Sequence, residues 1–301
     1  MVTSISTNRL VIRPLAVSDS DFILELVNTE TWLKYIGDRQ VHSQSTAKAY
    51  IQNILENPST RYWVVGLRNT NISLGIVTVI KRDYLEYPDI NCAFLVKYTN
   101  HGYAYESSKA VLHQLIETRE YTHFSAITKP GNYRSIKLLK KLGLEYVGEI
   151  EISNEKSHLY QASVDGILIA NITKSFFSIF TSNDIKRANQ ILLREICIPQ
   201  MLVISHNKIK TQILDLESYV ESQRKILSDG TVTEIEEKEL FSETKITGDL
   251  AARFSEYEII GIVFKQKFRV KRVKILQFVK IRESWKLTSI VCEDRDVPII
   301  R

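Results

Sequence analysis

The sequence predicts two domains in tandem, an α/β domain followed by an α+β domain. In residues 1–165, short apolar strand-type runs alternate with segments whose apolar residues recur at helical spacing, as in an α/β sheet. In residues 166–301, helical segments come first and long strand-type segments follow, which favours a curved sheet around helices. With 301 residues, the chain is long enough for two domains of ordinary size.

The first domain is expected to alternate strands and helices along most of its length. Strands are predicted over 9–15, 61–67, 72–81, 90–96, 146–152 and 158–163, from branched and apolar runs bounded by turn residues. Helices are predicted up to Val27, around Trp32, over 46–56 behind a Ser45 cap, over 105–118, and in a segment that ends at Gly143.

The second domain is expected to begin near Gly166, where the pattern changes. Three helices are predicted over 167–180, 184–193 and 215–227, the last behind an Asp215 cap. Strands are predicted over 232–247, 250–260, 262–271, 273–282 and 285–292.

Composition and charge narrow the class of protein. Hydrophobic residues make up 44% and charged residues 25%, as in soluble globular proteins, and the net charge of +5 is too small to indicate nucleic-acid binding by itself. The three cysteines are far apart and form neither a metal-type spacing nor a disulfide framework. No signal peptide or membrane-spanning run is present. We therefore expect a cytoplasmic protein without a metal or a membrane partner.

The most informative stretch is residues 89–144, which reads as strand, glycine turn, helix, strand and helix. The segment His101-Gly102-Tyr103-Ala104 joins the first strand to the first helix. Glycine permits a sharp turn and leaves no side chain between the backbone amides and a ligand. Because a helix N-terminus attracts phosphate, this turn is a candidate cradle for a pyrophosphate.

Two blocks carry a family resemblance. The stretch NCAFLVKYTNHGYAYES is similar to the pattern G-F-A-F-L-P-x-Y-x-G-K-G-Y-A-x-E-A, and NYRSIKLLKKLGL is similar to N-x-x-S-x-x-L-L-x-K-L-G-F. Together they resemble the Gcn5-related N-acetyltransferase superfamily, in the branch that includes ribosomal-protein alanine acetyltransferases. The resemblance implies a mixed, splayed central sheet with helices on both faces. It also implies acetyl-coenzyme A as the donor and a primary amine, of a small molecule or a protein N-terminus, as the acceptor.

The resemblance also implies the residues that bind the cofactor. Backbone groups of the splayed strand would bind the pantetheine, and amides of the turn would bind the pyrophosphate; these residues are Phe94, Leu95, Val96, His101, Gly102, Tyr103 and Ala104. His101 stands where the family often has Lys or Arg, and Thr99 and Asn100 also depart from the pattern. These departures predict weaker cofactor binding without its loss.

Catalytic roles are implied for a few further residues. Asn132 matches a residue that hydrogen-bonds the cofactor arm or a water, and Ser135 is placed to donate to the sulfur, although an N-cap and a surface serine are the alternatives. Asp89 is the first choice of general base and Glu106 the second; a solvent-facing acid and a first-turn acid are the alternatives. Many members of the family use a tyrosine acid where this chain has Leu139.

The second domain resembles the SnoaL-like, cone-shaped α+β barrels, in which a curved antiparallel sheet surrounds helices. The resemblance rests on the order of elements and on the phrases GDLAARFSEYEIIG and ESWKLTSIVCEDR. Such barrels usually enclose an apolar pocket, but His206 reads as a turn residue, and Tyr257 and Trp285 as core or pocket lining. We assign no catalysis to this domain; recognition of a substrate or homodimerisation is expected.

Three functions are consistent with these patterns. The first is an N-acetyltransferase, which the nearly intact cofactor blocks favour. The second is a catalytically weak protein that binds acyl-coenzyme A or senses a small ligand. The third is a nucleic-acid factor that uses Lys265, Lys267, Arg269 and Lys271, which alternate along one strand; a solvated outer face is the alternative, with Phe264 and Phe268 on the buried side. The sequence does not identify the acceptor, since the loops expected to form its pocket, 31–45 and 84–89, contain no motif specific for one substrate.

Overall fold

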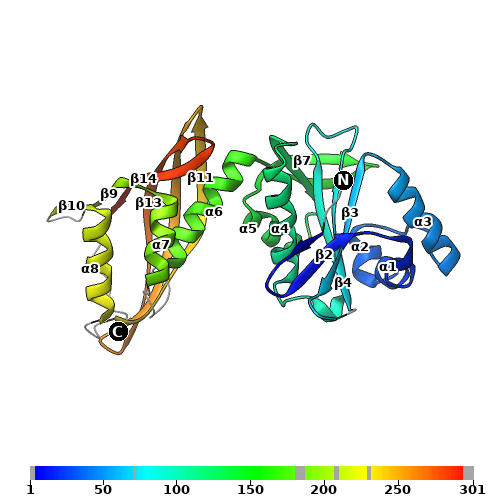
Figure 1. Cartoon of the computed structure of the whole chain (residues 1–301), viewed down its shortest axis with the longest axis horizontal. Helices are drawn as coiled ribbons and strands as arrows, with labels where there is room; N and C mark the ends of the chain where they lie inside the picture. The colour runs from blue at the N-terminus through cyan, green and yellow to red at the C-terminus, as the bar shows by residue number, and fades with distance from the viewer. Residues whose placement is uncertain (1–3, 71, 180–186, 207–209, 229–231, 294–301) are drawn as a thin grey trace. The chain divides into compact units, whose positions relative to one another are not determined.

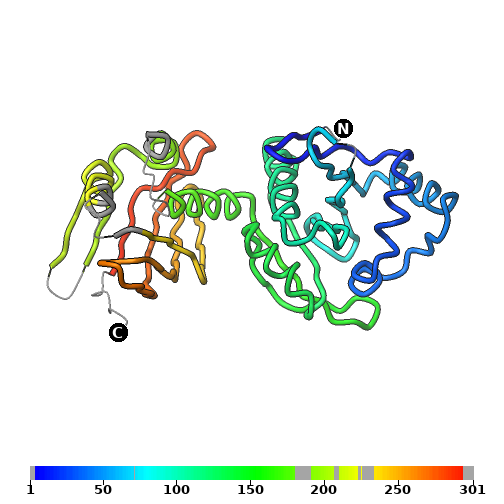
Figure 2. Tube along the Cα trace, turned by 90° about the horizontal axis from the view of Figure 1, so that it is seen from below, coloured from blue at the N-terminus to red at the C-terminus, as the bar shows by residue number. Residues whose placement is uncertain are grey.

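The computed structural model describes residues 4–70, 72–179, 187–206, 210–228 and 232–293. The chain divides into two compact units, Met1–Ile167 and Leu168–Arg301. Figure 2 follows the Cα trace from the first unit, in blue to green, to the second, in green to red. Among the described helices, none has the length and apolar character needed to cross a membrane.

The first unit is built on a mixed sheet, as predicted, and the sheet has eight strands, of which the first, β1, was not predicted. The strand order is β1-β2-β3-β4-β5-β6-β8-β7, and every neighbouring pair is antiparallel except β5 and β6. The strands are β1 (Ile5–Ser6), β2 (Leu10–Pro14), β3 (Thr60–Leu67), β4 (Ser73–Ile80), β5 (Asp89–Phe94), β6 (His123–Thr128), β7 (Glu145–Ile152) and β8 (Glu155–Ser163).

Helices cover both faces of this sheet (Figure 1). They are α1 (Ser20–Val27), α2 (Glu30–Tyr35), α3 (Gln44–Glu56), α4 (Tyr103–Glu117) and α5 (Tyr133–Leu142), with short 3₁₀ turns at Val17–Asp19 and Val96–Tyr98. Leu112 of α4 and Leu139 of α5 pack with Phe124 of β6 in one core. Leu26 of α1 and Ile51 of α3 pack with residues such as Ile76 of β4 in a second core on the other face.

The two parallel strands of this sheet separate from each other. β5 and β6 are paired only where Asp89, the first residue of β5, lies opposite Ser125, the third residue of β6. A parallel pair of this length would normally continue its ladder along both strands. The strands therefore form a split that is closed at Asp89 and open at their carboxyl ends.

One cap in the first unit differs from the prediction. The helix expected behind Ser45 begins one residue earlier, at Gln44, and its N-cap is Ser43. Ser43 Oγ accepts from the Thr46 amide, while Thr46 Oγ1 accepts from the Ser43 amide. This reciprocal capping box satisfies two backbone donors at once, so it outcompetes a cap at Ser45.

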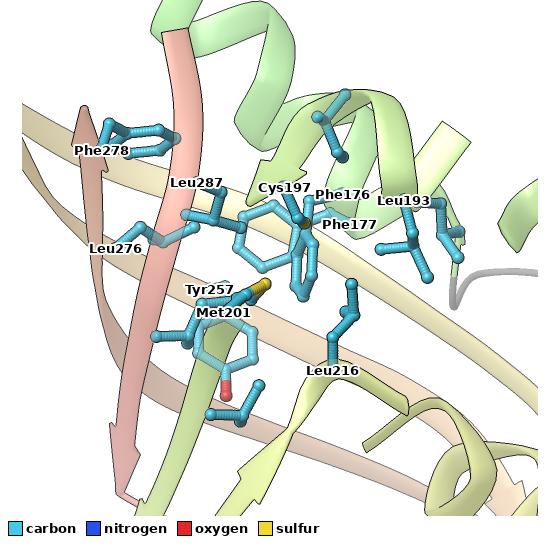
Figure 3. Close-up of a cluster of buried hydrophobic side chains, with 14 of the residues drawn as sticks. Phe176, Phe177, Leu193, Cys197, Met201, Leu216, Tyr257, Leu276, Phe278 and Leu287 are labelled. Atoms are coloured by element: carbon cyan, nitrogen blue, oxygen red, sulfur yellow. The ribbon is translucent and has the colours of Figure 1, made fainter. Parts of the chain in front are cut away.

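The second unit is a six-stranded sheet with helices packed on one face. The strand order is β10-β9-β14-β13-β12-β11, antiparallel except between β14 and β9. The elements are α6 (Val164–Ile179), α7 (Arg187–Ile196), β9 (Cys197–His206), β10 (Thr211–Asp215), α8 (Leu216–Ser228), β11 (Val232–Thr247), β12 (Leu250–Val263), β13 (Gln266–Ile281) and β14 (Ser284–Glu293). In Figure 3, Phe176 and Phe177 of α6 point toward Met201 of β9 and Tyr257 of β12.

Several predicted elements of the second unit are confirmed. The strand over Val232–Thr247 has the expected bounds, and the helix behind Asp215 is capped by its Oδ1, which accepts from the Ser218 amide at 2.7 Å. The first three residues of the helix predicted over 184–193 lie outside the described residues; α7 begins at Arg187.

Other predictions for this unit were wrong. The strands expected over 262–271 and 273–282 are largely one strand, β13, and the chain reverses at Phe264 and Lys265, both with positive φ. Phe264 is therefore exposed in a hairpin turn, whereas Phe268 is buried as predicted. Strands β9 and β10 were not predicted, and His206 ends β9, where its Nδ1 lies 2.9 Å from Thr211 Oγ1.

The face of the second sheet that lies opposite its helices carries a row of apolar side chains. The row crosses five neighbouring strands in register and consists of Phe254, Ile275, Val291, Ile204 and Ile213. Phe254 is 37% exposed, Ile275 42% and Ile213 62%. We call these five residues the outer row.

Candidate active site

The predicted pyrophosphate cradle forms a turn at the N-terminus of α4. Asn100 and Gly102 both have positive φ, and Gly102, at φ 82°, is the N-cap residue. A side chain at Gly102 would be strained, since L-residues rarely adopt this conformation. The amides of the first turn of a helix have no acceptor within the helix. Those of Tyr103 and Ala104 are therefore available to an anion.

His101 has its ring fixed against the turn. Its Nδ1 lies 2.8 Å from the Thr99 carbonyl, and the ring stacks on Tyr103 with centroids 5.5 Å apart. Because a carbonyl can only accept, Nδ1 must carry hydrogen. The neutral ring then offers only an acceptor at Nε2, so the His101 side chain can donate to a phosphate only when it is protonated.

At the end of β5, the structure changes the expected roles of the backbone groups. The Leu95 amide donates to the Leu74 carbonyl, and the Leu95 carbonyl accepts from the Tyr98 amide, both at 2.9 Å. The Leu95 amide is therefore used within the sheet, whereas the Leu95 carbonyl keeps a second lone pair with which it can accept from pantetheine. Successive amides of an antiparallel strand point to opposite sides. Phe94 thus directs its amide away from β4, toward the split.

Asp89 lies at the closed end of the split and is fully buried. Its Oδ2 accepts from Arg82 Nε at 2.5 Å and its Oδ1 from the Ile127 amide at 3.2 Å. Burial raises the pKa of Asp89, although Arg82 and the Ile127 amide act in the opposite direction. The alternative that Asp89 simply faces solvent was wrong, because the carboxylate joins β5 to β6.

Asn132 and Ser135 lie together at the N-terminus of α5. Asn132 Oδ1 accepts from the Ser135 amide at 3.2 Å, so Asn132 is the N-cap of this helix. The helix ends as predicted at Gly143, which has φ 93°. Since β5 and β6 are parallel, their carboxyl ends share one edge of the sheet, and α4 and α5 both begin at that edge.

Two expected acid–base positions are occupied by other interactions. Leu139 is buried in the core, where it contributes packing but no proton donor. Glu106 accepts from Thr7 Oγ1 at 2.6 Å and from Arg9 Nε at 2.8 Å. Burial alone would raise the pKa of Glu106, but these hydrogen bonds outweigh it and lower the pKa. Glu106 is thus a poor proton acceptor.

A cavity of about 610 Å³ lies beside the turn. Its lining includes Arg9, Gly102, Tyr105, Glu106, Lys109 and Lys141. Lys141 Nζ lies 4.2 Å from the centre of the Tyr105 ring. Basic side chains therefore surround the space next to the candidate phosphate site. The sequence did not predict this cavity, because the cavity forms where the fold places Arg9 next to α4, a helix that begins more than 90 residues later.

A polar row on the opposite face of the sheet was also missed. Tyr62, Thr78 and Asn91 lie side by side in register on β3, β4 and β5. Tyr62 also hydrogen-bonds Tyr50 of α3, and burial raises the pKa of both phenols. The only sequence signal was a polar residue at an alternate position of each apolar strand, which is common in half-exposed sheets.

Comparison with known proteins agrees with this architecture. Residues 9–145 match the model of the acetyltransferase (GNAT) domain family. An uncharacterized N-acetyltransferase, YnaD of Bacillus subtilis (strain 168), is 26% identical over 144 residues, which are 48% of this chain and 84% of the relative.

Solved structures with similar folds cover the same part of the chain. An acetyltransferase of the GNAT family from Bacillus anthracis is 23% identical, with 54% of this chain and 98% of that chain covered and a TM-score of 0.47. The ribosomal-protein-S5-alanine acetyltransferase from Vibrio fischeri is 18% identical, with 54% and 97% covered and a TM-score of 0.48. On the strength of the family match, residues 9–145 form an acetyltransferase (GNAT) domain, and the chain is an acyltransferase that depends on acetyl-coenzyme A.

Proposed function

We propose that the enzyme transfers the acetyl group of acetyl-coenzyme A to a primary amine, either of a small molecule or of a protein N-terminus. One observation carries the proposal. The split between β5 and β6 opens at the edge of the sheet where the glycine turn begins α4. A single cofactor can therefore place its diphosphate at the turn and its thioester arm in the split.

Each part of the cofactor has a proposed set of contacts. The amides from His101 to Ala104 bind the diphosphate, where the dipole of the 15-residue helix α4 favours negative charge. The amide of Phe94, the carbonyl of Leu95 and the amide of Val96 bind the pantetheine arm, since the Leu95 carbonyl accepts one hydrogen bond whereas the Val96 carbonyl accepts two from Thr99. Lys109 and Lys141, in the cavity beside the turn, suit the phosphate of the nucleotide end.

The proposed reaction is a direct attack. The amine nitrogen forms a bond to the thioester carbon, the carbon–sulfur bond breaks, and the sulfur leaves as a thiolate. The Phe94 amide polarises the carbonyl oxygen. Ser135 donates to the departing sulfur, and Asn132 orients the arm. Asp89 lies five residues before Phe94 on β5, roughly 16 Å along the strand, so it is proposed to take the proton from the amine through a relay of bound water. Its raised pKa favours this role over Glu106.

The acceptor is proposed to bind on the sheet face that carries Tyr62, Thr78 and Asn91. Helices α4 and α5 cover the other face. On this face α3 contacts the row through Tyr50 and Thr78 is buried, so an acceptor would meet the half-buried Tyr62 and Asn91. Side-chain hydroxyl and amide groups in this row can hydrogen-bond a polar acceptor.

The test is thiol release. We expect acetyl-coenzyme A to raise the unfolding temperature, and a panel of amines that includes peptides, amino acids, polyamines and aminoglycosides to give acceptor-dependent release of coenzyme A. Stabilisation by acetyl-coenzyme A without release, with every acceptor, would instead support the second candidate, a weakly catalytic protein that binds acyl-coenzyme A or senses a ligand. The missing tyrosine at Leu139 favours that candidate.

We also propose that residues 1–165 are the catalytic domain and that residues 166–301 are a SnoaL-like, cone-shaped domain. One mixed sheet with three helices on its inner face supports the second assignment. The alternative function, a nucleic-acid factor that uses the basic residues of one strand, loses support. Arg269 Nε lies 2.6 Å from Glu258 Oε1, and Lys265 lies in the hairpin turn.

The second domain is proposed to join two copies of the chain through the outer row. The row spans about 20 Å, because neighbouring strands are ~5 Å apart. Exposed Leu202 and Phe241 extend it on the same face, toward the several hundred Å² per partner that a stable interface needs. A second copy presents the same row, so an isologous dimer pairs apolar surface with apolar surface.

A further inference from the structure

We propose that Arg9 and Glu106 form a positioning pair that holds the glycine turn in the conformation that binds the diphosphate. The inference rests on the proposed function and adds two residues to it. The pair acts on the backbone of the turn, and both residues also line the cavity beside it.

Glu106 is the anchor of the pair. It lies in the first turn of α4 and accepts from Arg9 Nε, from the Arg9 amide at 3.3 Å and from Thr7 Oγ1. Thr7 Oγ1 also accepts from the Leu10 amide at 3.0 Å, which fixes the chain between β1 and β2. The carboxylate therefore ties the N-terminal strands to the start of the helix.

Arg9 connects Glu106 to the turn. Its NH2 lies 2.6 Å from Glu106 Oε2, while its NH1 donates to the His101 carbonyl at 3.0 Å. The guanidinium also stacks over the Tyr103 ring, 4.7 Å from its centre. One side chain thus contacts the residues on both sides of Gly102.

Holding the His101 carbonyl has a direct consequence for the ligand site. In a turn with residues of positive φ, rotation of one peptide exchanges the places of its carbonyl and the next amide. A carbonyl that faces the diphosphate would repel it, whereas an amide binds it. By accepting from Arg9, the His101 carbonyl is kept on the back of the turn, and the Gly102 amide in the same peptide points the opposite way.

Three of the five N–H donors of the guanidinium have partners within the protein. Nε and NH2 are directed to the carboxylate and NH1 to the carbonyl, which uses the fork geometry that Arg has and Lys lacks. Glu106→Gln would keep the positive charge of Arg9 but weaken its orientation. This variant therefore separates positioning from a simple charge effect.

The chain offers a matched control in Arg61 and Glu120. Arg61 NH1 donates to Glu120 Oε2 at 2.7 Å, and both side chains are about one-third exposed. This pair has the same chemistry in the same domain, on β3 and after α4, but it has no contact with the turn. Arg61→Gln therefore reports the effect of losing an Arg–Glu pair elsewhere.

The experiment compares two ligands on the full chain. Calorimetry gives Kd for coenzyme A, and NMR titration gives Kd for acetyl-pantetheine, which has the arm but no diphosphate. We expect Arg9→Gln and Glu106→Gln each to raise Kd for coenzyme A about ten-fold and the double variant to add little more, since the residues act as a unit. Arg9→Lys should recover part of the affinity. Kd for acetyl-pantetheine should stay within about two-fold of wild type, and Arg61→Gln should match wild type with both ligands.

Two results would overturn the pair. In the first, Arg9→Gln binds coenzyme A as tightly as Arg61→Gln does. In the second, affinity for both ligands falls equally, which means that the pair only stabilises the domain. Wild-type protein that binds neither ligand would overturn the proposed function, and the pair with it, so the two failures are distinguishable.

Discussion

At the scale of single residues, the site depends on two carboxyl groups whose pKa values are shifted in opposite directions. Asp89 has a pKa raised by burial, while hydrogen bonds from Thr7 and Arg9 lower the pKa of Glu106. The difference assigns them different roles. Asp89 is suited to exchange a proton, and Glu106 is suited to keep its charge and hold Arg9.

Replacing Asp89 tests its role as base. Asp89→Asn should lower kcat by about 10²-fold or more, as is typical for loss of a general base, and should change KM for the amine much less. In wild type, kcat should fall as the pH drops through the raised pKa of Asp89 and its carboxylate is protonated. Steady-state kinetics across pH measures both effects. If Asp89→Asn keeps kcat within about three-fold of wild type, Asp89 is not the base, and its role is the structural contact with Arg82 and the Ile127 amide.

The lowered pKa of Glu106 predicts how stability depends on pH. A folded-state pKa below the unfolded value, which is near 4.5, means that the carboxylate stabilises the fold above that pH and that this contribution is lost as the pH falls through the folded pKa. Glu106→Gln should therefore be less stable than wild type at about pH 7, and the gap should be smaller at about pH 3. Urea unfolding at both pH values measures the gap. An equal gap at both would show that charge is not the cause.

At the scale of elements, the geometry of the split depends on how closely β4 and β5 approach. A Cβ on Gly75 would lie 2.4 Å from the Ala93 carbonyl oxygen and 2.5 Å from the Phe94 ring. Only glycine allows this approach, which sets the position of the Phe94 amide. β5 is therefore placed by a residue on its neighbour.

Gly75→Ala should push β5 away from β4. We expect a loss of about 1–3 kcal/mol in the free energy of unfolding, as in other overpacked sites, together with weaker binding of coenzyme A. Gly131→Ala is the control, because nothing lies within 4 Å of its Cβ position. Chemical denaturation and calorimetry measure the two effects. If Gly75→Ala and Gly131→Ala behave alike, the close approach does not position the strand.

Local signals in the sequence predicted elements well, and long-range contacts explain the errors. Gly102, Asn132 and Gly143 act at turns and helix ends, where the residue itself decides the backbone. Arg9 and Glu106 are 97 residues apart, so no local pattern could pair them. Likewise, the hairpin at Phe264 and Lys265 adopts positive φ without glycine or asparagine, and β9 contains Pro199, which argues against a strand.

At the scale of the whole molecule, the two units have different proposed tasks. The first carries every residue assigned to cofactor binding and catalysis. The second contributes the outer row, whose exposed apolar side chains lie on five strands. Catalysis and self-association are therefore expected to be separable by mutation.

The outer row predicts the oligomeric state. Ile275→Lys places a charge at the centre of the row, so we expect a change from dimer to monomer in sedimentation experiments, with the far-UV spectrum unchanged. Ile191→Lys on α7 is the control, because Ile191 is 60% exposed and lies outside the row. A wild-type monomer, or a dimer that tolerates Ile275→Lys, would be evidence against the row as the interface.

The most direct test of the central claim is a crystal structure with coenzyme A bound. We expect the diphosphate to contact the amides from Gly102 to Ala104 and the thiol to lie between β5 and β6, past the Phe94 amide. Coenzyme A bound elsewhere, with side chains filling the split, would contradict it.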